Sequence, residues 1–224
     1  MDQDPAVPAG PFADVGAAAL WTDLIRRLQE IICIAEAPHA RGCLLGIGDD
    51  AAVFDPPAGR QVVVCTDSLV ESVHFHAETS AASIGHKALA VNLSDLAAMG
   101  AEPAWATLSV TFPAIDEAWL AAFMQGFSAL AARHDIQLVG GDTTKGPQAF
   151  TLQAQGFIEP GRAMLRSGAR PGDAIYVTGT LGAAGAALAA FGPEFTRHAK
   201  IGQRQELVSR RITAIVAAHC RHQA

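Results

Sequence analysis

The chain has 224 residues, half of them hydrophobic, and its 22 acidic and 16 basic side chains give a formal net charge of −6. A chain of this length and composition can bury a sizeable core, in one large domain or in one and a half ordinary ones. The acidic balance, with no basic stripe interleaved with aromatic residues, argues against nucleic acid as the main partner. A phosphate ligand that carries a metal ion remains compatible with an acidic surface, because the cation supplies the positive charge.

Cysteine usage and the first residues indicate the compartment. The four cysteines, Cys33, Cys43, Cys65 and Cys220, form no C-x-x-C pair, which argues against a zinc ribbon and fits a reducing cytoplasm. Residues 1–16 lack the basic start and the long apolar run of a secretory signal, so we expect a mobile tail there. No stretch has the ~18 consecutive apolar residues of a membrane helix. We therefore expect a cytoplasmic protein without a membrane partner.

The apolar pattern predicts helices and strands that alternate irregularly. Apolar residues three and four apart indicate helices, and β-branched or aromatic runs between turn residues indicate strands. Gly100 stands where a helix closes in a left-handed turn, and Asp116 stands where a helix begins. The expected elements are a helix over 17–35, a buried strand over 61–66, a loosely alternating stretch over 69–76, a helix over 83–99, a strand over 105–112, a helix from 116 to about 134, strands over 136–139, 150–158 and 174–178, and helices over 181–191 and 203–219.

This order of elements favours an α/β (α+β-like) fold around a mixed sheet over strict βαβ winding. The stretch Glu159–Arg162 contains Pro and Gly and marks a domain boundary. We therefore expect a tail over 1–16, an N-terminal domain over 17–158 and an incomplete C-terminal domain over 159–224.

Two adjacent carboxylates, Asp49 and Asp50, follow two glycines in the stretch Gly46–Val53. Glycine lets the backbone approach a ligand closely. Neighbouring carboxylates repel each other unless a cation, hydrogen bonds or water lies between them, and hard cations such as Mg²⁺ take oxygen ligands and bridge to phosphates. A solvated turn explains the same residues, because Gly and Asp favour turns by themselves.

Three later acidic positions favour the metal over the turn. Asp67 and Asp142 each follow an expected strand, the second after a Gly-Gly pair, and ligand sites usually lie at such ends. Asp95 lies three residues after Asn92 on a largely apolar helix, so the two share a face. A buried carboxylate there needs a cation, donors or solvent, and a solvated stripe is the alternative. Several carboxylates at glycine turns indicate metal-bridged phosphate chemistry.

His74 and His76 lie two residues apart and would share one face of a strand. The pair could hold zinc, but the sequence offers no evident third ligand. A histidine that faces a phosphate, or is simply half buried, is the simpler interpretation.

Together these motifs resemble the thiamine-monophosphate kinase family, of the aminoimidazole ribonucleotide synthetase superfamily. Each motif alone is weak, but the Asn-Leu-Ser-Asp-Leu-Ala-Ala-Met-Gly run joined to Gly-Gly-Asp-Thr-Thr is highly specific, and the resemblance covers residues 46–191. The segments that carry it are Gly46–Asp50, Thr66–Asp67, His74–Phe75, Lys87–Ala101, Gly140–Thr144 and Arg166–Ala169.

The resemblance implies an N-terminal α/β domain of the synthetase type that forms a homodimer by joining sheets, followed by part of a C-terminal α+β domain. It implies transfer of the γ-phosphate of ATP to thiamine monophosphate, giving thiamine diphosphate. It also implies that His74 meets the thiamine phosphate. The implied ligands of several Mg²⁺ ions are Asp49, Asp50, Cys65, Thr66, Asp67, Asp95 and Asp142, and the implied nucleotide contacts are Gly141, Asp142 and Arg166.

These residue types suit the reaction. The acceptor is already a phosphate anion, so no strong general base is needed, and the difficulty is to bring two polyanions together. Bound cations relieve that repulsion.

Two alternatives stay open. A sibling synthetase of the same superfamily would share the glycine and Asp elements, and a non-catalytic nucleotide-binding or dimerisation module would keep the fold without the activity. Members of the family continue well beyond the length of this chain, and residues 203–224 do not match them. We therefore expect the second half of the site to be missing here and phosphate transfer to be slow or absent.

Overall fold

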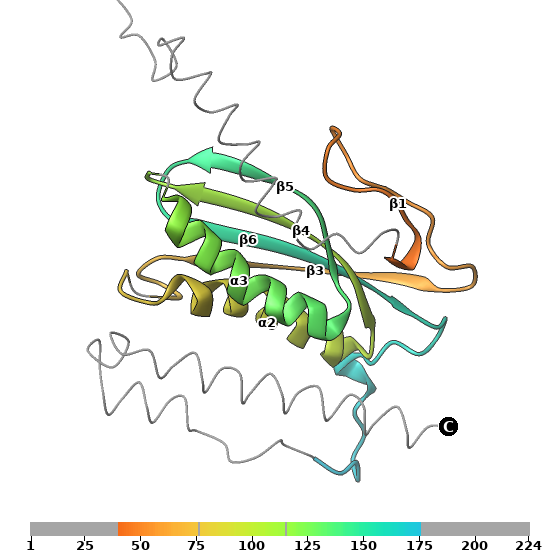
Figure 1. Cartoon of the computed structure of the whole chain (residues 1–224). Coiled ribbons are helices and arrows are strands. Elements are labelled where there is room, and N and C mark those ends of the chain that lie inside the picture. Colours follow the sequence, from red (N-terminus) through yellow and green to blue (C-terminus); the bar gives the residue numbers. More distant parts are fainter. Residues whose placement is uncertain (1–39, 76, 115, 176–224) are drawn as a thin grey trace, which may run out of the picture.

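The computed structural model describes residues 40–75, 77–114 and 116–175 (Figure 1). The expected helices over 17–35, 181–191 and 203–219, together with His76, lie outside the described residues, and so does most of the expected strand over 174–178. No helix of the described part is long and apolar enough to cross a membrane.

A four-stranded sheet forms the centre of the described part, in the order β3-β6-β4-β5. Strand β6 runs antiparallel to both β3 and β4, whereas β4 and β5 run parallel. The mixed sheet predicted from the sequence is therefore confirmed. The strands are β3 (Gln61–Val70), β4 (Glu102–Phe112), β5 (Gln137–Lys145) and β6 (Ala149–Ile158).

Two helices, α2 (Ala81–Met99) and α3 (Glu117–His134), cover one face of the sheet (Figure 1). The predicted helix ends are confirmed: Gly100 closes α2 with φ 76°, and the Asp116 side chain accepts hydrogen bonds from the first turn of α3. The helices cross closely at Gly126, where a Cβ atom would lie 1.9 Å from the Ala82 carbonyl oxygen. Only glycine fits this crossing.

An aromatic cluster fills the core between α3 and the sheet. Phe150 of β6 stacks on Phe123 at 4.7 Å between ring centroids and on Trp119 at 5.7 Å, and Phe112 meets it edge-on at 5.6 Å. Offset and edge-on aromatic pairs of this kind stabilise a core beyond their buried area. The cluster fixes the end of the sheet at which β3 and β4 terminate.

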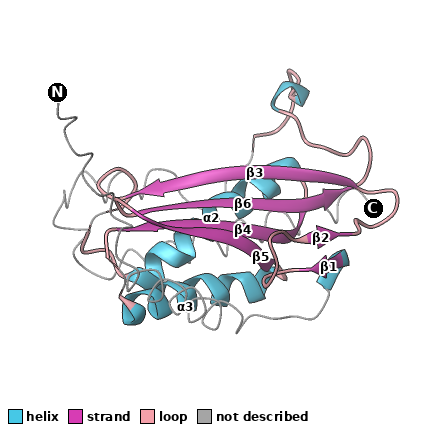
Figure 2. Ribbon diagram, turned by 90° about the horizontal axis from the view of Figure 1, so that it is seen from above, coloured by secondary structure: helices cyan, strands magenta, loops and turns pink. Residues whose placement is uncertain are grey.

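The opposite face of the sheet has a different cover. A short hairpin, β1 (Cys43–Leu45) and β2 (Val53–Phe54), packs on one end of it, where Phe54 stacks on Trp105 at 4.0 Å (Figure 2). Beyond the hairpin, the side chains on this face are mostly Thr, Ser and Gln and are exposed or half buried. We call this surface the open face; its polar members on β3, β4 and β6 are Thr66, Ser68, Thr107, Ser109, Thr111, Thr151 and Gln153. The exposed valines of β3, Val62, Val64 and Val70, lie on the same face.

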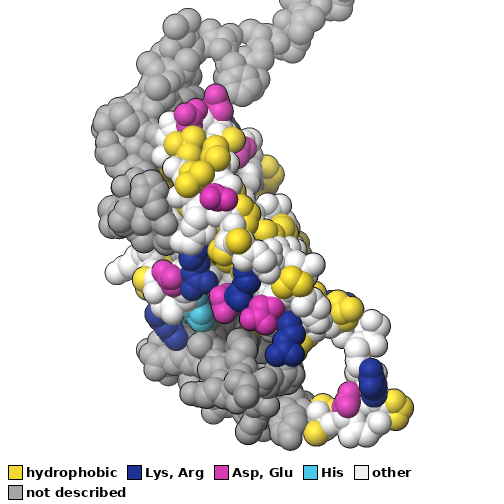
Figure 3. Space-filling model, turned by 90° about the vertical axis from the view of Figure 1, so that its right-hand side faces the viewer, with side chains coloured by type: hydrophobic (Ala, Val, Ile, Leu, Met, Phe, Trp, Pro, Cys, Tyr) yellow, Lys and Arg dark blue, Asp and Glu magenta, His cyan; other side chains and the backbone are white. Residues whose placement is uncertain are grey.

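Ion pairs tie the hairpin end of the molecule together. Arg60 contacts Glu102 at 2.9 Å and Glu159 at 3.6 Å, and Arg41 contacts Asp135 at 3.1 Å. Figure 3 shows acidic and basic side chains intermixed on this side of the molecule. Because the carboxylates are largely exposed, each pair stabilises the fold by at most ~1 kcal/mol.

Strands β3 and β5 continue well beyond their predicted ends. Strand β3 continues to Val70 and β5 continues to Lys145, so Asp67 and Asp142 lie inside strands and not at their ends. The strand predicted over 61–66 is present as the start of β3, but its predicted burial is wrong, because β3 is an edge strand whose Val62 and Val64 are exposed. In both places the pairing with a neighbouring strand overrides residues that favour turns.

The stretch over 69–76 is a strand end followed by a turn. Strand β3 ends at Val70, and Glu71 to Phe75 form a turn in which the Ser72 N–H donates to the Phe75 carbonyl and Ser72 has φ 64°. His74 therefore does not lie on a strand.

Candidate functional site

Asp67 and Asp95 come together at the β3 edge of the sheet. Alternate residues of β3 face the helices, and Asp67 pairs in register with Leu152, a core residue. Asp67 therefore points to the face on which α2 packs. Burial raises the pKa of the Asp67 carboxyl, the charge of Asp95 raises it further, and His74 opposes the shift. Two like charges this close favour binding of a cation.

Cys65 lies one step earlier on the same strand face. Its Sγ is 3.4 Å from the Asn92 carbonyl oxygen, 3.6 Å from Asn92 Oδ1 and 3.8 Å from the Ala154 carbonyl oxygen. Burial raises the pKa of the Cys65 thiol to about 11, and the charge of Asp95 contributes. The thiol is therefore neutral at pH 7 and unsuited to a hard cation, which leaves its backbone carbonyl as the group able to meet one.

Asp49 and Asp50 lie in the loop of the β1–β2 hairpin and are exposed. The Asp50 N–H donates to Asp49 Oδ1 at 2.9 Å, and Gly48 has φ 127°, a conformation that other residues rarely adopt. The hairpin projects from the sheet on the side away from α2 (Figure 1). The loop thus presents two carboxylates without bringing them to Asp67.

Asp142 faces the other side of the sheet from Asp67. It pairs in register with Ser109, which pairs with Thr151, and all three belong to the surface away from the helices. Strands β3 and β5 are the two edges of the sheet, so about 14 Å separates Asp67 from Asp142 at the usual strand spacing. The Thr144 hydroxyl donates to Asp142 Oδ2 at 3.0 Å.

Gly141 precedes this carboxylate where β4 and β5 approach each other closely. A Cβ atom built on Gly141 would lie 1.9 Å from the Leu108 carbonyl oxygen. The close strand contact accounts for this glycine whether or not it meets a nucleotide.

His74 lies on the turn after β3 with its ring exposed. The Val70 N–H donates to His74 Nδ1 at 3.0 Å, so Nδ1 is the acceptor and Nε2 of the neutral ring carries the proton. Lys87 of α2 stabilises this turn, because its ammonium group donates a hydrogen bond to the His74 carbonyl oxygen. Burial lowers the pKa of Lys87. The result is a fixed imidazole that offers an N–H close to Asp67.

Arg166 begins the short helix η2 (Arg166–Gly168) and is exposed. The Met164 N–H, two residues earlier, donates to the Met99 carbonyl at the end of α2. This contact anchors the segment that carries Arg166 to the helix that carries Asp95.

The predicted ligands do not all meet in this structure. Among the described residues, no three His, Cys, Asp or Glu side chains lie together in the arrangement of a metal site. Asp67 and Asp95 form one group with His74 nearby, Asp49 and Asp50 form a second, and Asp142 lies apart. Thr66 is exposed on the open face, next to Asp67 in sequence but on the other side of the sheet.

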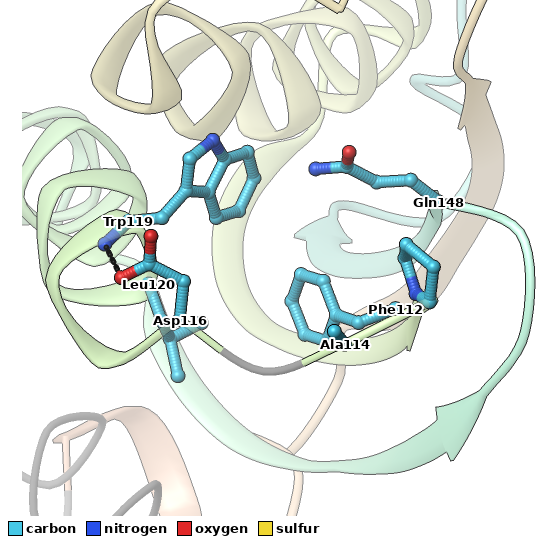
Figure 4. Close-up of a pocket in the computed structure, with 7 residues that line it drawn as sticks. Phe112, Ala114, Asp116, Trp119, Leu120 and Gln148 are labelled. Atoms are coloured by element: carbon cyan, nitrogen blue, oxygen red, sulfur yellow. Dashed lines mark hydrogen bonds between the residues drawn. The ribbon is translucent and has the colours of Figure 1, made fainter.

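A pocket of about 180 Å³ lies at the start of α3, away from these carboxylates (Figure 4). Trp119, Phe112 and Pro113 form most of its apolar lining, and Gln148 and Asp116 lie at its polar rim. Asp116 is engaged in capping, since Oδ1 accepts from the Ala118 and Trp119 N–H groups. None of the predicted site residues lines this pocket.

Two residues escaped a functional assignment from sequence. Lys87 is the first residue of the motif Lys87–Ala101, within α2, and the sequence shows of Asn92 only that it shares a helix face with Asp95. The sequence shows how far each residue lies from Asp95, but it does not show their hydrogen-bond partners. Lys87 meets the His74 carbonyl and Asn92 meets the Cys65 thiol only because of the way α2 packs on β3.

Comparison with known proteins agrees with this arrangement. Residues 48–158 match the family model of the AIR synthase related protein, N-terminal domain. The chain carries an N-terminal domain of the AIR synthase related family. The match covers the four-stranded sheet, both helices and every candidate site residue except Arg166.

This AIR synthase related chain is similar to thiamine-monophosphate kinases. That of Escherichia coli (strain K12) is 54% identical over 145 residues, which cover 65% of this chain and 45% of the relative. The crystal structure of the Stenotrophomonas maltophilia K279a enzyme is 51% identical with a TM-score of 0.54, covering 62% of this chain and 43% of that one.

A third similar protein has been solved with bound ligands. The structure of AaThiL complexed with AMPPCP and TMP is 29% identical with a TM-score of 0.56, and the match covers 75% of this chain and 51% of that chain. The chain thus spans less than half the length of the Escherichia coli relative and about half the length of this one.

Proposed function

We propose that this chain is the metal- and nucleotide-binding part of a kinase that transfers the γ-phosphate of ATP to thiamine monophosphate, yielding thiamine diphosphate. The observation that carries the proposal is the Asp67–Asp95 pair with the His74 imidazole beside it. The similarity to thiamine-monophosphate kinases supports it, as does the AaThiL complex with AMPPCP, an ATP analogue, and TMP.

The donor set fits Mg²⁺. Asp67 and Asp95 supply carboxylate oxygens, their mutual repulsion disfavours the empty state, and hard oxygen ligands are those that Mg²⁺ prefers. We propose that the Asp67 and Asp95 carboxylates hold metal and that Cys65 and Thr66 contribute from the backbone of β3, since the Thr66 side chain lies on the open face. Asp49 and Asp50, which lie apart in this structure, are proposed as further ligands. Bound Mg²⁺ would neutralise phosphate charge during transfer.

His74 would hold the acceptor phosphate. His74 is exposed, and the hydrogen bond from the Val70 N–H to Nδ1 leaves the proton of the neutral ring on Nε2. A hydrogen bond to a charged phosphate is among the stronger kinds, so one oriented donor can place the acceptor close to the carboxylate pair. No residue needs to remove a proton, because the attacking oxygen is already anionic.

The separation of Asp142 from Asp67 supports a site shared between two copies of the chain. Asp142 and Thr66 are on the open face but on opposite edge strands. If two copies join with their open faces together, Asp142 of the partner subunit can approach Thr66 of β3 across the interface, next to the strand position of Asp67, whose side chain points to the other face. The homodimer implied by the sequence would then be required for a complete site.

The nucleotide would lie along the β5 edge, with Gly141, Asp142 and Arg166 in contact with it. The proposal keeps the domains expected from the sequence, 17–158 and 159–224, in which Arg166 belongs to the second domain. A sibling synthetase, or a module that binds nucleotide without transferring phosphate, remains the alternative function.

Calorimetric titration with ATP, with and without Mg²⁺, tests the proposal. We expect Mg²⁺–ATP to bind and free ATP in excess chelator to bind far more weakly, because the Asp67–Asp95 pair and the triphosphate are both negatively charged and repel each other without a cation. Phosphate transfer to thiamine monophosphate, assayed beside a full-length relative, separates the kinase from the binding module. Equal affinity for ATP with and without metal would contradict the proposed site.

A further inference from the structure

Two neighbouring contacts join β3 to α2. In the first, Cys65 Sγ lies 3.6 Å from Asn92 Oδ1 and 3.4 Å from the Asn92 carbonyl oxygen. In the second, Asp67 points to the face on which α2 packs, and the charge of Asp95 on that helix raises the pKa of the Asp67 carboxyl. Asp67 follows Cys65 by two residues on one strand face, and Asp95 follows Asn92 by three on one helix face. The Cys65–Asn92 contact therefore lies next to the carboxylate pair, two residues earlier on β3 and about one helical turn earlier on α2.

Asn92 is an unusual residue for its position. Its side chain is 0% exposed, and among the described residues no other polar or charged side chain is classed as buried. The Nδ2 group donates to the Ala88 carbonyl at 3.2 Å, which turns Oδ1 toward Cys65. A buried amide is costly unless it is hydrogen-bonded, and an apolar side chain would fill the space without that cost. Some benefit other than packing is needed to explain it.

We propose that Asn92 is a positioning residue, which through Cys65 fixes the separation and orientation of Asp67 and Asp95 so that both carboxylates accept the same divalent cation. The inference rests on the proposed metal site. The carboxylates repel each other, so without a fixed frame the metal-free helix and strand can shift apart. A directional contact one step below the pair opposes that shift where nonpolar packing, which is not directional, does not.

The first test replaces the amide with an apolar side chain of similar size. In the full 224-residue chain, Asn92→Leu should keep its fold but bind Mg²⁺, or Mn²⁺ as a probe with the same oxygen ligands, about 10-fold to 100-fold more weakly, as is usual when a group supporting a metal ligand is lost. Calorimetric titration with the metal alone measures this. Ile84→Val, a buried substitution at the far end of α2, should lower stability and leave the metal affinity unchanged.

The strand side of the contact provides a second pair of variants. Cys65→Ala removes the donor and should weaken metal binding as Asn92→Leu does. Cys65→Ser restores a donor at the same place and should recover most of the lost affinity. This pair keeps the proposal testable if Asn92→Leu fails to fold.

A double-mutant cycle separates positioning from general stability. In an Asp95→Asn background the cation no longer depends on the spacing of the pair, so adding Asn92→Leu should change the metal affinity little. An equal loss with and without Asp95, or wild-type affinity in Asn92→Leu, overturns the inference while the proposed function stands. If the unmodified chain binds neither metal, the inference and the proposed metal site both fail.

Discussion

Asp67 and Asp142 carry the same functional group in different surroundings, and this predicts different responses to the same substitution. Burial and the charge of Asp95 raise the pKa of Asp67. Because its folded-state pKa exceeds the unfolded value, the ionised carboxylate destabilises the fold at pH values above that pKa, and the penalty is lost as pH falls through it. Asp142 instead accepts a hydrogen bond from Thr144.

Near pH 7 and without metal, we therefore expect the Asp67→Asn variant to melt at the wild-type temperature or above it. The difference in melting temperature between the variant and the wild type should vanish as pH falls below about 4. The gain should stay below ~1 kcal/mol, since the group is partly solvated. Asp142→Asn should show no gain, and both should weaken Mg²⁺-dependent nucleotide binding. Thermal melts from pH 3 to pH 8 measure the first effect, and a large loss of melting temperature in both variants would make these residues structural.

His74 offers a second test at the scale of one residue. His74→Ala removes the Nε2–H donor proposed for the acceptor phosphate, and a hydrogen bond to a charged group is worth ~1.5–3 kcal/mol. Thiamine monophosphate should then bind roughly 10-fold to 100-fold more weakly, by calorimetry with Mg²⁺ present. Val73→Ala, on the same turn and 72% exposed, is the matched control. Equal affinities in the two variants would exclude a phosphate contact at His74.

At the scale of elements, sequence predicted helix ends better than strand ends. The ends of α2 and α3 depend on local residues, Gly100 and Asp116, whose preferences act through the chain's own backbone. The ends of β3 and β5 depend on strand β6 and strand β4, which supply hydrogen bonds through residues that otherwise favour turns. The acidic residues could therefore be selected as candidates from the sequence, but the face of the sheet on which each lies was not predictable.

The irregular register of β5 explains why Asp142 could not be oriented from sequence. The pairing shifts between Ala106 and Thr107, so that Leu138 and Gly140 are their successive partners and Val139 is left over. A single extra residue reverses the face of every side chain after it. Both Asp142 and Thr144 therefore point to the open face.

The crossing of α2 and α3 is a third place where a substitution has a clear expected outcome. Gly126→Ala puts a Cβ atom 1.9 Å from a backbone oxygen of α2, so the helices must separate. We expect destabilisation of ~1–3 kcal/mol, despite the better helix propensity of alanine. Urea denaturation measures it, with Gln125→Ala, an exposed position on α3, as control. Unchanged stability would mean that the helices adjust without cost.

At the scale of the whole molecule, the positions of Asp67 and Asp142 predict the outcome of mixing two inactive variants. Each variant alone should have every shared site damaged. If Asp67 of one copy works with Asp142 of the partner subunit, a mixed dimer of Asp67→Asn and Asp142→Asn chains has one site with both carboxylates and one with neither. Random pairing of equal amounts makes half the dimers mixed, so about one quarter of wild-type Mg²⁺–ATP binding should return.

The measurement is the stoichiometry of Mg²⁺-dependent nucleotide binding, by calorimetry, after the two variants are unfolded together and refolded. Light scattering on the same samples should give a dimer at micromolar concentrations, because the long exposed edge of β3 and the open face are left for a partner by the described part of the chain. Recovery on mixing requires that the carboxylates come from different copies, since no rearrangement within one chain can restore a site from two damaged ones. A dimer that shows no recovery would instead mean that Asp142 reaches the metal within its own chain, across the ~14 Å that now separates it from Asp67.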